Sequence, residues 1–452
     1  MKKTTNLKIK SSSSLVFTLA VVALFFFSSC EKLIEVGPKK NALTPTAVFS
    51  DSITVQSAVV GMYTTGSAYG GSITYLNSLY SDELTNVSYP QYEADALTAA
   101  DQSAGTIWKE SYATIYKANL IIEGVQSSSA LSSVAKSQAT AEAKFFRAFC
   151  HFYLLNLFGN VPLITTTNAD ITALQPQTSS VLVYQQIIED LTYAAANLPG
   201  DYSLSGGARV RVNKYAAIAL LARTYLYMGD YQNAETQSAL VINSSNYSIL
   251  TDLSKVFLAN NNEAIWQYDS KVAGYPAIAQ YLVPSPGAQP QFILTNQLLN
   301  SFESGDNRKT VWISNSAGFA YPSKYFSLSG GLQFDVVLRL GEQYLIRSEA
   351  RAQSGNITGA QADLDVIRKR AGLSNTVASD KTTLLLAIEK ERLAELFCEW
   401  GHRFLDLKRT GRLDQVLGAA KPGIWKPTAA QYPIPAVEIS KNNKLLQNPG
   451  YN

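Results

Sequence analysis

Apolar residues recur at intervals of three and four along most of the chain after residue 47, a pattern typical of amphipathic helices. Small alanines between the larger side chains would let neighbouring helices approach closely. The pattern predicts helices over Asp51–Tyr63, Thr106–Gln126, Ser137–Phe158, Val181–Leu198, Asn213–Met228, Tyr231–Asn243, Leu338–Ser354, Thr358–Ala371, Lys381–Gly401 and Phe404–Arg409. Between about residues 245 and 335 the helical period is lost, and Asn, Ser, Gly, Pro and aromatic residues predict loops with short strands. The predicted fold class is therefore mostly α.

Two of the predicted helix pairs share a local pattern. Each places a glycine between two periodic segments, Gly229 in the first pair and Gly355 in the second, and a small alanine follows, Ala234 or Ala360. Glycine ends a helix where the backbone needs a positive φ, and alanine lets the second helix pack on the first. Each pair resembles a tetratricopeptide helix–turn–helix unit. Because the copies are irregularly spaced, we expect tetratricopeptide-like pairs within a compact alpha-helical scaffold rather than a regular solenoid.

The N-terminus has the pattern of a lipoprotein signal peptide. Four lysines in the first ten residues precede an uninterrupted apolar stretch, Leu15–Phe27, which is shorter than the ~20 residues of a membrane-spanning helix. Two serines and Cys30 follow, which resembles a bacterial lipobox. We predict a signal peptide over residues 1–29, lipidation at Cys30 and a tether over residues 30–46. The alternative is a short signal anchor with an incidental cysteine.

Composition argues against several classes of protein. Charged residues make up 16% of the 452 residues, below the usual fraction of about 25%. All four lysines of residues 1–29 would leave with the signal peptide, so the remainder is close to neutral and nucleic acid is not an expected partner. Two histidines and three cysteines are too few for a histidine-based metal site or a disulfide scaffold, so no metal and no cofactor is predicted. The 25 tyrosines and 18 phenylalanines favour a surface for neutral ligands.

Four segments, in order along the chain, carry a resemblance to a known family. The first, Ala141–Leu163, reads AEAKFFRAFCHFYLLNLFGNVPL, and the second, Val337–Leu373, contains Glu342, Tyr344, Glu349 and the closing RAGL. The others are Glu391–Arg409, ERLAELFCEWGHRFLDLKR, and the final stretch Tyr432–Tyr451, which ends in QNPGY. Together with the lipobox, these segments resemble the SusD/RagB family of Bacteroidetes outer-membrane lipoproteins. Trp400, Gly341 and Ser348 depart from the family pattern and affect packing rather than membership.

The resemblance implies a non-enzymatic cell-surface protein of the outer membrane. Such a protein binds a nutrient, usually an oligosaccharide or polysaccharide, and delivers it to a SusC-like TonB-dependent transporter. The corresponding regions would be an N-terminal helical region over residues 47–245 and a loop-rich region with the C-terminal helices over residues 246–452. Two alternatives stay open: the same architecture binding peptides or another non-sugar nutrient, and a tetratricopeptide-like scaffold that binds only proteins.

Two loops supply the candidate ligand-binding residues. Sugar rings pack their C–H faces on aromatic rings, and their hydroxyls need amides and carboxylates. In Leu84–Ala100, tyrosines on either side of a proline favour exposure, and Lys271–Phe326 spreads aromatic residues through Gly-, Pro- and Ser-rich sequence. The candidates are Asn86, Tyr89, Tyr92, Tyr275, Tyr281, Trp312 and Tyr321. Aromatic residues in periodic segments are assigned to the core instead: Trp108, Tyr112, Tyr116, Trp266 and Trp400.

A row of glutamates permits a catalytic alternative. Glu391, Glu395 and Glu399 follow each other at a spacing of four, so we place them on one flank of a helix. A glycosidase needs two carboxyl groups that face each other across a sugar, which residues on one flank cannot provide. We therefore predict structural ion pairs, with Arg347, Arg351, Arg392 and Arg403 as the candidate cations. Cys150 and Cys398 are predicted to be buried packing residues, with no nucleophile formed by Cys150 and His151.

Overall fold

A computed structural model describes residues 45–67, 70–86 and 88–451. Cys30 and the predicted signal peptide lie outside the described residues, as does the tether up to residue 44. The helices are α2 (Pro45–Val48), α3 (Ser52–Ser67), α4 (Gly70–Tyr80), α5 (Pro90–Glu93), α6 (Gln102–Ser127), α7 (Ser133–Phe158), α8 (Ala169–Thr172), α9 (Ser180–Asn197), α10 (Lys214–Met228), α11 (Tyr231–Ile242), α12 (Ala279–Leu282), α13 (Asn296–Ser301), α14 (Asn307–Val311), α15 (Leu340–Gln353), α16 (Ile357–Arg370), α17 (Lys381–Leu396), α18 (His402–Arg409), α19 (Leu413–Ala420) and α20 (Ala436–Lys441). The strands are β1 (Leu84–Thr85), β2 (Ala264–Tyr268), β3 (Ile293–Leu294), β4 (Ile313–Ser316), β5 (Phe319–Pro322) and β6 (Asp335–Arg339).

The predicted helices are present, with shifts of a few residues at most of their ends. Two differences change the element to which a residue belongs. Leu338 and Arg339 belong to β6 rather than to the helix that follows, and α17 ends at Leu396 instead of Gly401. After α17 the backbone takes positive φ at Cys398, Trp400 and Gly401, which no helix accommodates. Glu399 therefore lies in a turn, and it does not share the helix of Glu391 and Glu395.

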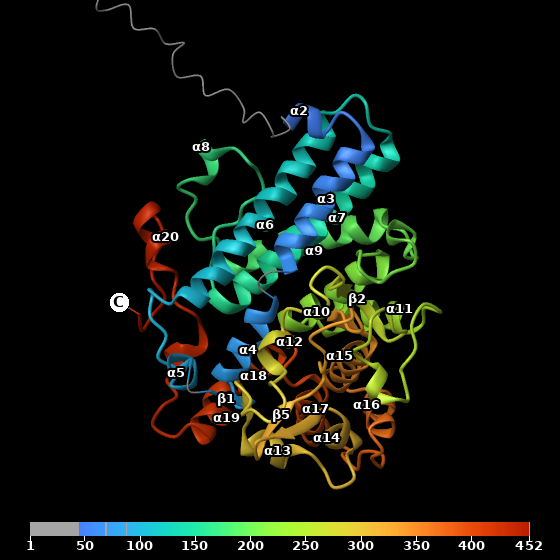
Figure 1. Ribbon diagram of the computed structural model, residues 1–452, viewed down its shortest axis with the longest axis vertical. Helices are drawn as coiled ribbons and strands as arrows, with labels where there is room; N and C mark the ends of the chain where they lie inside the picture. The colour runs from blue at the N-terminus through green and yellow to red at the C-terminus, as the bar shows by residue number, and fades with distance from the viewer. Residues whose placement is uncertain (1–44, 68–69, 87, 452) are drawn as a thin grey trace, which may run out of the picture. The chain divides into compact units, whose positions relative to one another are not determined.

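Long helices pack side by side and form most of the core (Figure 1). α7 contacts both α6 and α9, and α10 with α11 and α15 with α16 form the two predicted pairs. Gly229 and Gly355 take φ of 74° and 85° between the helices of their pairs, as predicted. α11 also packs on α15, so the two pairs are joined to each other. The prediction of tetratricopeptide-like pairs in a mostly helical scaffold is confirmed.

Helix α4 was not predicted. Nearly all of its described side chains are buried, so the segment has no polar face and no helical period in its sequence. Its first residue packs tightly: a Cβ added at Gly70 would lie 2.6 Å from Cη2 of Trp400. Glycine is therefore required here by close packing rather than by backbone conformation.

The described strands form three two-stranded antiparallel ladders. β2 pairs with β6, β1 with β3, and β4 with β5, which is a local hairpin. β2 and β6 are fully buried, so they belong to the core. The loop-rich region with short strands is thus as predicted between residues 245 and 335.

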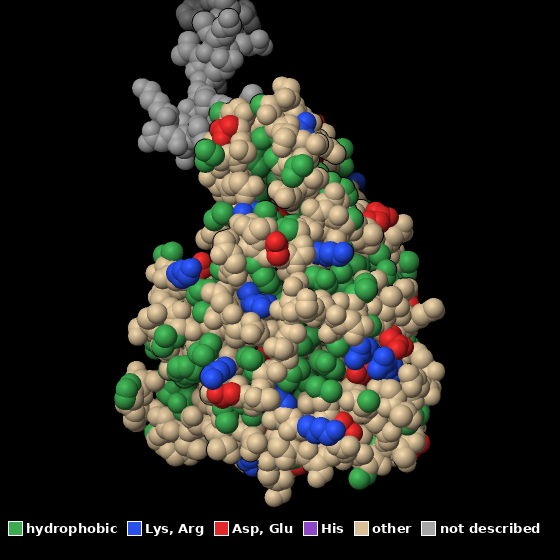
Figure 2. All heavy atoms as spheres, turned by 90° about the vertical axis from the view of Figure 1, so that its right-hand side faces the viewer, with side chains coloured by type: hydrophobic (Ala, Val, Ile, Leu, Met, Phe, Trp, Pro, Cys, Tyr) green, Lys and Arg blue, Asp and Glu red, His purple; other side chains and the backbone are tan. Residues whose placement is uncertain are grey.

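The surface carries few charged side chains (Figure 2), as the low fraction of charged residues in the sequence predicts. On the face shown in Figure 2, lysine, arginine and acidic side chains are few and scattered, and neutral polar and hydrophobic groups separate them. Within the described part of the chain, no helix combines the length and the apolar character that crossing a membrane requires.

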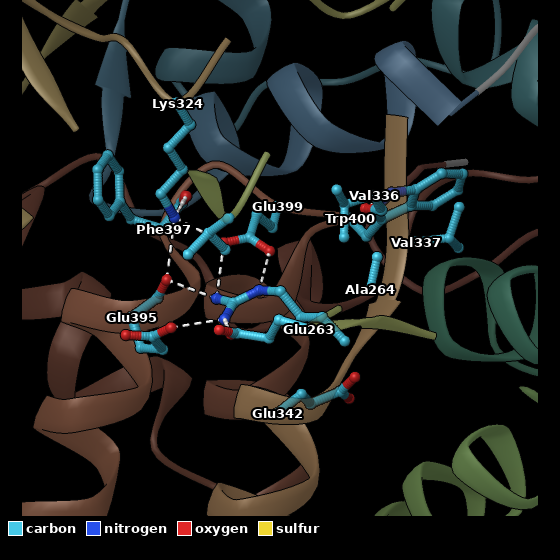
Figure 3. Close-up of polar contacts among 12 residues, drawn as sticks. Glu263, Ala264, Lys324, Val336, Val337, Glu342, Glu395, Phe397, Glu399 and Trp400 are labelled. Atoms are coloured by element: carbon cyan, nitrogen blue, oxygen red, sulfur yellow. Dashed lines mark hydrogen bonds and ion pairs between the residues drawn. The ribbon is translucent and has the colours of Figure 1, made fainter. Parts of the chain in front are cut away.

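Glu395 and Glu399 belong to a buried network of charges (Figure 3). Glu263, Lys324, Glu395 and Glu399 converge from separate elements in this view. Nη1 of Arg339 lies 2.5 Å from Oε1 of Glu395, and its Nε lies 2.8 Å from Oε2 of Glu399. Nζ of Lys324 lies 2.6 Å from Oε1 of Glu399. The network holds the turn after α17 against β6, so these carboxylates are structural.

The prediction of ion pairs is confirmed, but the predicted cations are wrong. Arg308, Arg339 and Arg370 surround Glu395, and Arg308 and Arg368 bind Glu391. The four predicted arginines pair elsewhere: Arg347 with Asp363, Arg351 with Glu235 and Asp363, Arg392 with Asp406, and Arg403 with Asp82 and Glu389. The partners of the glutamates come from distant segments, which spacing along one helix cannot indicate.

Candidate functional site

The β1–β3 ladder brings the two candidate loops together. Leu84 lies opposite Leu294 and Thr85 opposite Ile293, although the strands are about two hundred residues apart in the sequence. Beyond the ladder, Nδ2 of Asn86 donates to the backbone oxygen of Gln291. The first loop is thereby fixed to the second, and side chains of both lie on one surface.

Four aromatic rings form a cluster at this junction, which we call the aromatic cluster: Tyr75, Tyr89, Tyr281 and Phe292. Tyr75 and Phe292 are buried and form its floor. Tyr89 and Tyr281 are partly exposed, and their ring centroids lie 5.5 and 4.6 Å from that of Tyr75. Tyr89 also stacks on Phe292 with 6.1 Å between centroids and an interplanar angle of 16°. The cluster thus combines a buried aromatic floor with two rings that stay partly exposed.

A hollow of about 560 Å³ borders the same ladder. Its walls combine Thr85 and Glu93 from the first loop with Asn296 and Gln297 from α13. Hydroxyl, carboxylate and amide groups are the partners that sugar hydroxyls need, and the volume falls within the range of small-molecule sites. The hollow and the aromatic cluster thus both adjoin the β1–β3 ladder, since Phe292 directly precedes β3.

Of the charged side chains that line the hollow, Asp82 and Lys421 form ion pairs, and Glu93 is held by hydrogen bonds. Nζ of Lys421 lies 2.9 Å from Oδ1 of Asp95, and Arg403 binds Asp82. Burial raises the pKa of Asp95 to about 6, although Lys421 opposes the shift. Glu93 accepts hydrogen bonds from Oγ1 of Thr85 at 2.6 Å and from the backbone N–H of Asn86 at 3.2 Å. With its charged groups held by ion pairs or hydrogen bonds within the protein, this surface suits a neutral ligand.

Three of the candidate residues are buried, which corrects the prediction that the proline exposes both of its tyrosines. Tyr92 is 0% exposed, and its hydroxyl donates to Oδ1 of Asp101 at 2.6 Å. Trp312 is 1% exposed, and its Nε1 donates to the backbone oxygen of Leu253. The side chain of Asn86 is occupied by the contact with Gln291 and by the backbone N–H of Ser88. These three side chains hold loops in place and present no free group to a ligand.

Tyr275 and Tyr321 are partly buried like Tyr89 and Tyr281. Tyr321 lies on β5, opposite Ser314 of β4, and β5 packs against β3. Within the described part of the chain, neither ring pairs with the aromatic cluster. Both side chains border the same loop region, and their part in binding stays a prediction.

The sequence analysis missed the floor of the cluster. Tyr75 lies on α4, which has no amphipathic signal, and Phe292 directly precedes β3 in a segment with no helical period. Among the aromatic residues assigned to the core, Trp108, Trp266 and Trp400 are buried, as predicted. Tyr116 is 53% exposed, so its assignment is wrong: its position on α6 faces away from the packed side.

A helical scaffold that carries an aromatic, neutral surface on its loops defines the class of a non-catalytic binding protein. Comparison with known families gives the same class. A family model described as "Starch-binding associating with outer membrane" matches residues 35–226, and one described as "SusD family" matches residues 293–451. The chain belongs to the SusD/RagB family, and the prediction of a binding protein rather than an enzyme agrees with this.

Known relatives cover nearly the whole chain. "SusD-like protein P25" of Formosa agariphila is 25% identical over 519 residues, which cover 96% of this chain and 98% of the relative. "Starch-binding protein SusD" of Bacteroides thetaiotaomicron is 24% identical over 417 residues, which cover 69% of this chain and 72% of the relative. Among solved structures, a "Laminarin binding SusD-like protein" is 26% identical with a TM-score of 0.77, covering 88% of this chain and 99% of its own. A SusD-like protein of Bacteroides fragilis is 22% identical with a TM-score of 0.78. The match covers 90% of this chain and 100% of that protein's chain, and it shows a shared fold.

Proposed function

We propose that this protein captures a neutral oligosaccharide or polysaccharide on the aromatic cluster and delivers it to a SusC-like TonB-dependent transporter. The observation that carries the proposal is the meeting of Tyr89 and Tyr281 over Tyr75 and Phe292, beside a hollow lined with amide and hydroxyl groups. Rings bind the C–H face of a sugar, and the neighbouring groups bind its hydroxyls. Relatives named for starch and laminarin binding support this ligand class.

The proposed location is the cell surface at the outer membrane, with a lipid anchor at Cys30. Support comes from the apolar stretch before Cys30 and from the family description, which associates these proteins with the outer membrane. An anchor in the membrane would keep the captured glycan close to the transporter, where the local concentration exceeds that in solution. The proposed anchor and the proposed transporter partner are thus consistent with each other, since both lie at the outer membrane.

The ligand proposal is tested with the mature chain, residues 31–452, in native gels cast with neutral polysaccharides such as laminarin and starch. A retarding polysaccharide is then titrated calorimetrically as its oligosaccharide. We expect Tyr89→Ala and Tyr281→Ala each to weaken binding about tenfold, because loss of a stacked ring removes about 1.5 kcal/mol of apolar burial. Tyr116→Ala is the matched control, since Tyr116 is exposed on α6 and belongs to no part of the cluster.

Each outcome distinguishes the alternatives. Retardation that the two cluster variants abolish and the control variant preserves supports glycan capture at this site. Binding that survives both variants would place the ligand elsewhere. If no neutral glycan binds and calorimetry with peptide pools gives binding, the nutrient is peptidic, and if neither binds, the protein-only scaffold gains support. Sugars released from the polysaccharide would contradict a binding protein without catalysis.

A further inference from the structure

A second hollow, which we call the lysine hollow, lies where the C-terminal segment meets the ends of two helices. It has a volume of about 460 Å³ and shares no residue with the aromatic cluster or with the hollow beside it. Its walls come from the end of α7, the start of α9, Lys408 of α18 and the segment around residues 431–449. Among the described residues that line it there are asparagines, glutamines, a serine and a tyrosine, and no acidic side chain.

Lys408 is the single cation in this lining, and its ammonium group has spare donors. Nζ donates to the backbone oxygen of Asn156 at 2.6 Å, the only hydrogen bond it makes within the described part of the chain. Lys408 is partly exposed, and two other lysines of low exposure, Lys324 and Lys421, differ from it in their partners. Lys324 donates to two backbone oxygens and to Glu399, and Lys421 donates to two backbone oxygens and to Asp95. An ammonium carries three donors, so two of those on Lys408 lack a protein acceptor.

The absence of a counter-charge distinguishes Lys408 further. Lys324 and Lys421 each have a carboxylate within 3 Å, whereas no carboxylate of the described residues forms an ion pair with Lys408. Burial lowers the pKa of Lys408 to about 7, with no neighbouring acid to restore it. Burial of an unpaired charge is unfavourable, and an anion in the hollow would relieve that cost.

The start of α9 is another part of the lining. Helix α9 begins at Ser180, and its N-cap residue, Ser179, accepts no hydrogen bond through its side chain. The first backbone N–H groups of an 18-residue helix carry a partial positive charge. The N–H of Ser180 donates to Oδ1 of Asn160 at 3.2 Å. Neutral amides complete the walls: the side chains of Gln177, Gln447 and Asn448 hydrogen-bond backbone groups, and they carry no charge that would compete for the cation.

We propose that the lysine hollow binds the oxyanion of a small polar ligand, a carboxylate or sulfate group, with the ammonium of Lys408 as the counter-charge. The volume exceeds that of an inorganic ion, so the hollow has room for a larger polar anion such as a sugar acid. The site is separate from the aromatic cluster and does not depend on the proposed capture of neutral glycans.

Calorimetric titration of the mature chain at pH 6 tests the site, with sulfate, glucuronate and glucose as probes. We expect sulfate or glucuronate to bind and glucose not to bind. Tighter binding of glucuronate would identify a sugar acid, and tighter binding of sulfate a free or ester sulfate. Lys408→Gln should weaken the binding of the anion at least tenfold, and Lys214→Gln, which alters an exposed lysine on α10, should leave it unchanged.

A second variant keeps the test independent of the stability of Lys408→Gln. Ser180→Glu places a carboxylate on the exposed first residue of α9, where an acid stabilises the helix. The variant should fold, and its new charge should compete with the anion and weaken binding. The proposal is overturned if neither anion binds the wild type, if glucose binds equally well, or if Lys408→Gln and Ser180→Glu both bind as the wild type does.

The dependence on pH separates a charge contact from a packing role. Anion binding should weaken as the pH rises from 6 to 8, because Lys408 loses its proton in this window. The other titratable side chain among the described lining residues, Tyr184, has its pKa raised to about 12 by burial and stays neutral. The neighbouring Arg409 is held by Asp406 and Glu349 and stays charged. Lys408→Arg should bind the anion with no loss up to pH 8. If binding by that variant still weakened between pH 6 and 8 as it does in the wild type, the assignment to Lys408 would be contradicted.

Discussion

Glu395 offers the sharpest test of the buried charge network, through the substitution Glu395→Gln. Its carboxylate is 0% exposed and contacts three guanidinium groups, those of Arg308, Arg339 and Arg370. Burial alone would raise the pKa of Glu395, but Arg370, Arg339 and Arg308 together hold it well below its ordinary value. The side chain is therefore ionised in the folded protein, and glutamine removes the charge while keeping the shape.

The expected cost follows from what the substitution leaves behind. Three buried guanidinium groups lose a shared counter-charge, and loss of one partner from a buried ion pair costs about 3–5 kcal/mol. The amide oxygen of glutamine can still accept one hydrogen bond, so we expect a value near the lower end, about 3 kcal/mol. Against a total stability of about 5–15 kcal/mol, such a loss is easily resolved.

Urea unfolding of residues 31–452, followed by circular dichroism at pH 7, measures the change in the free energy of unfolding. The matched control is Glu303→Gln, because Glu303 pairs with Arg368 and Lys390 at the surface with 34% of its side chain exposed. An exposed pair contributes about 0–1 kcal/mol, so the control should change little. The stabilisation by Glu395 is complete above the ordinary pKa of a glutamate and is lost as the pH falls through its depressed folded value, so the difference should shrink in acid.

A loss below about 1 kcal/mol for Glu395→Gln, or a loss equal to that of the control, would refute the reasoning. It would mean that the three arginines find other acceptors or water when the charge is removed. In that case the strained turn after α17 would need a different explanation.

Two further predictions concern close packing and pH. Gly70→Ala should lower the free energy of unfolding by about 1–3 kcal/mol, because its Cβ would lie 2.6 Å from Trp400. In the same urea titration, the helical control Gly61→Ala, which meets no atom within 4 Å, should raise it by about 0.5–1 kcal/mol. Equal effects of the two would contradict the packing argument. Burial raises the pKa of Glu83 to about 7 from 4.5, so its contribution to stability falls as the pH rises from 4.5 to 7. Glu83→Gln should flatten this part of the pH profile, with a difference on the order of 3 kcal/mol at pH 8, and a profile that keeps the wild-type slope would exclude Glu83 as its source.

The local pattern of the chain was sufficient for most helices and for the helix pairs. Periodic apolar residues mark the buried face of an amphipathic helix, and Gly229 and Gly355 mark the turns, because both signals depend only on neighbouring residues. The apolar period did not predict helix α4, since a helix buried on nearly all sides has no polar face to produce a period. For the same reason the sequence analysis did not predict Tyr75 as part of the floor of the aromatic cluster, because Tyr75 lies on α4.

The loops that contain the candidate site were recognisable from composition, but their accessible side chains were not. Tyr89 and Tyr92 stand on either side of one proline, yet only Tyr89 stays partly exposed. The difference arises from Asp101, which binds the hydroxyl of Tyr92 and which no feature of the loop itself identifies as a partner.

Periodicity and motifs thus determined the fold class and the family, because both are encoded in short stretches of sequence, and composition indicated the loops that contain the candidate site. The pairing of β1 with β3, the arginines around Glu395 and the isolation of Lys408 were decided only by the tertiary structure. These contacts join segments far apart in the chain, and their strength depends on which side chains lose water together. That information arises when the helices pack, so it is absent from the local pattern of any one segment.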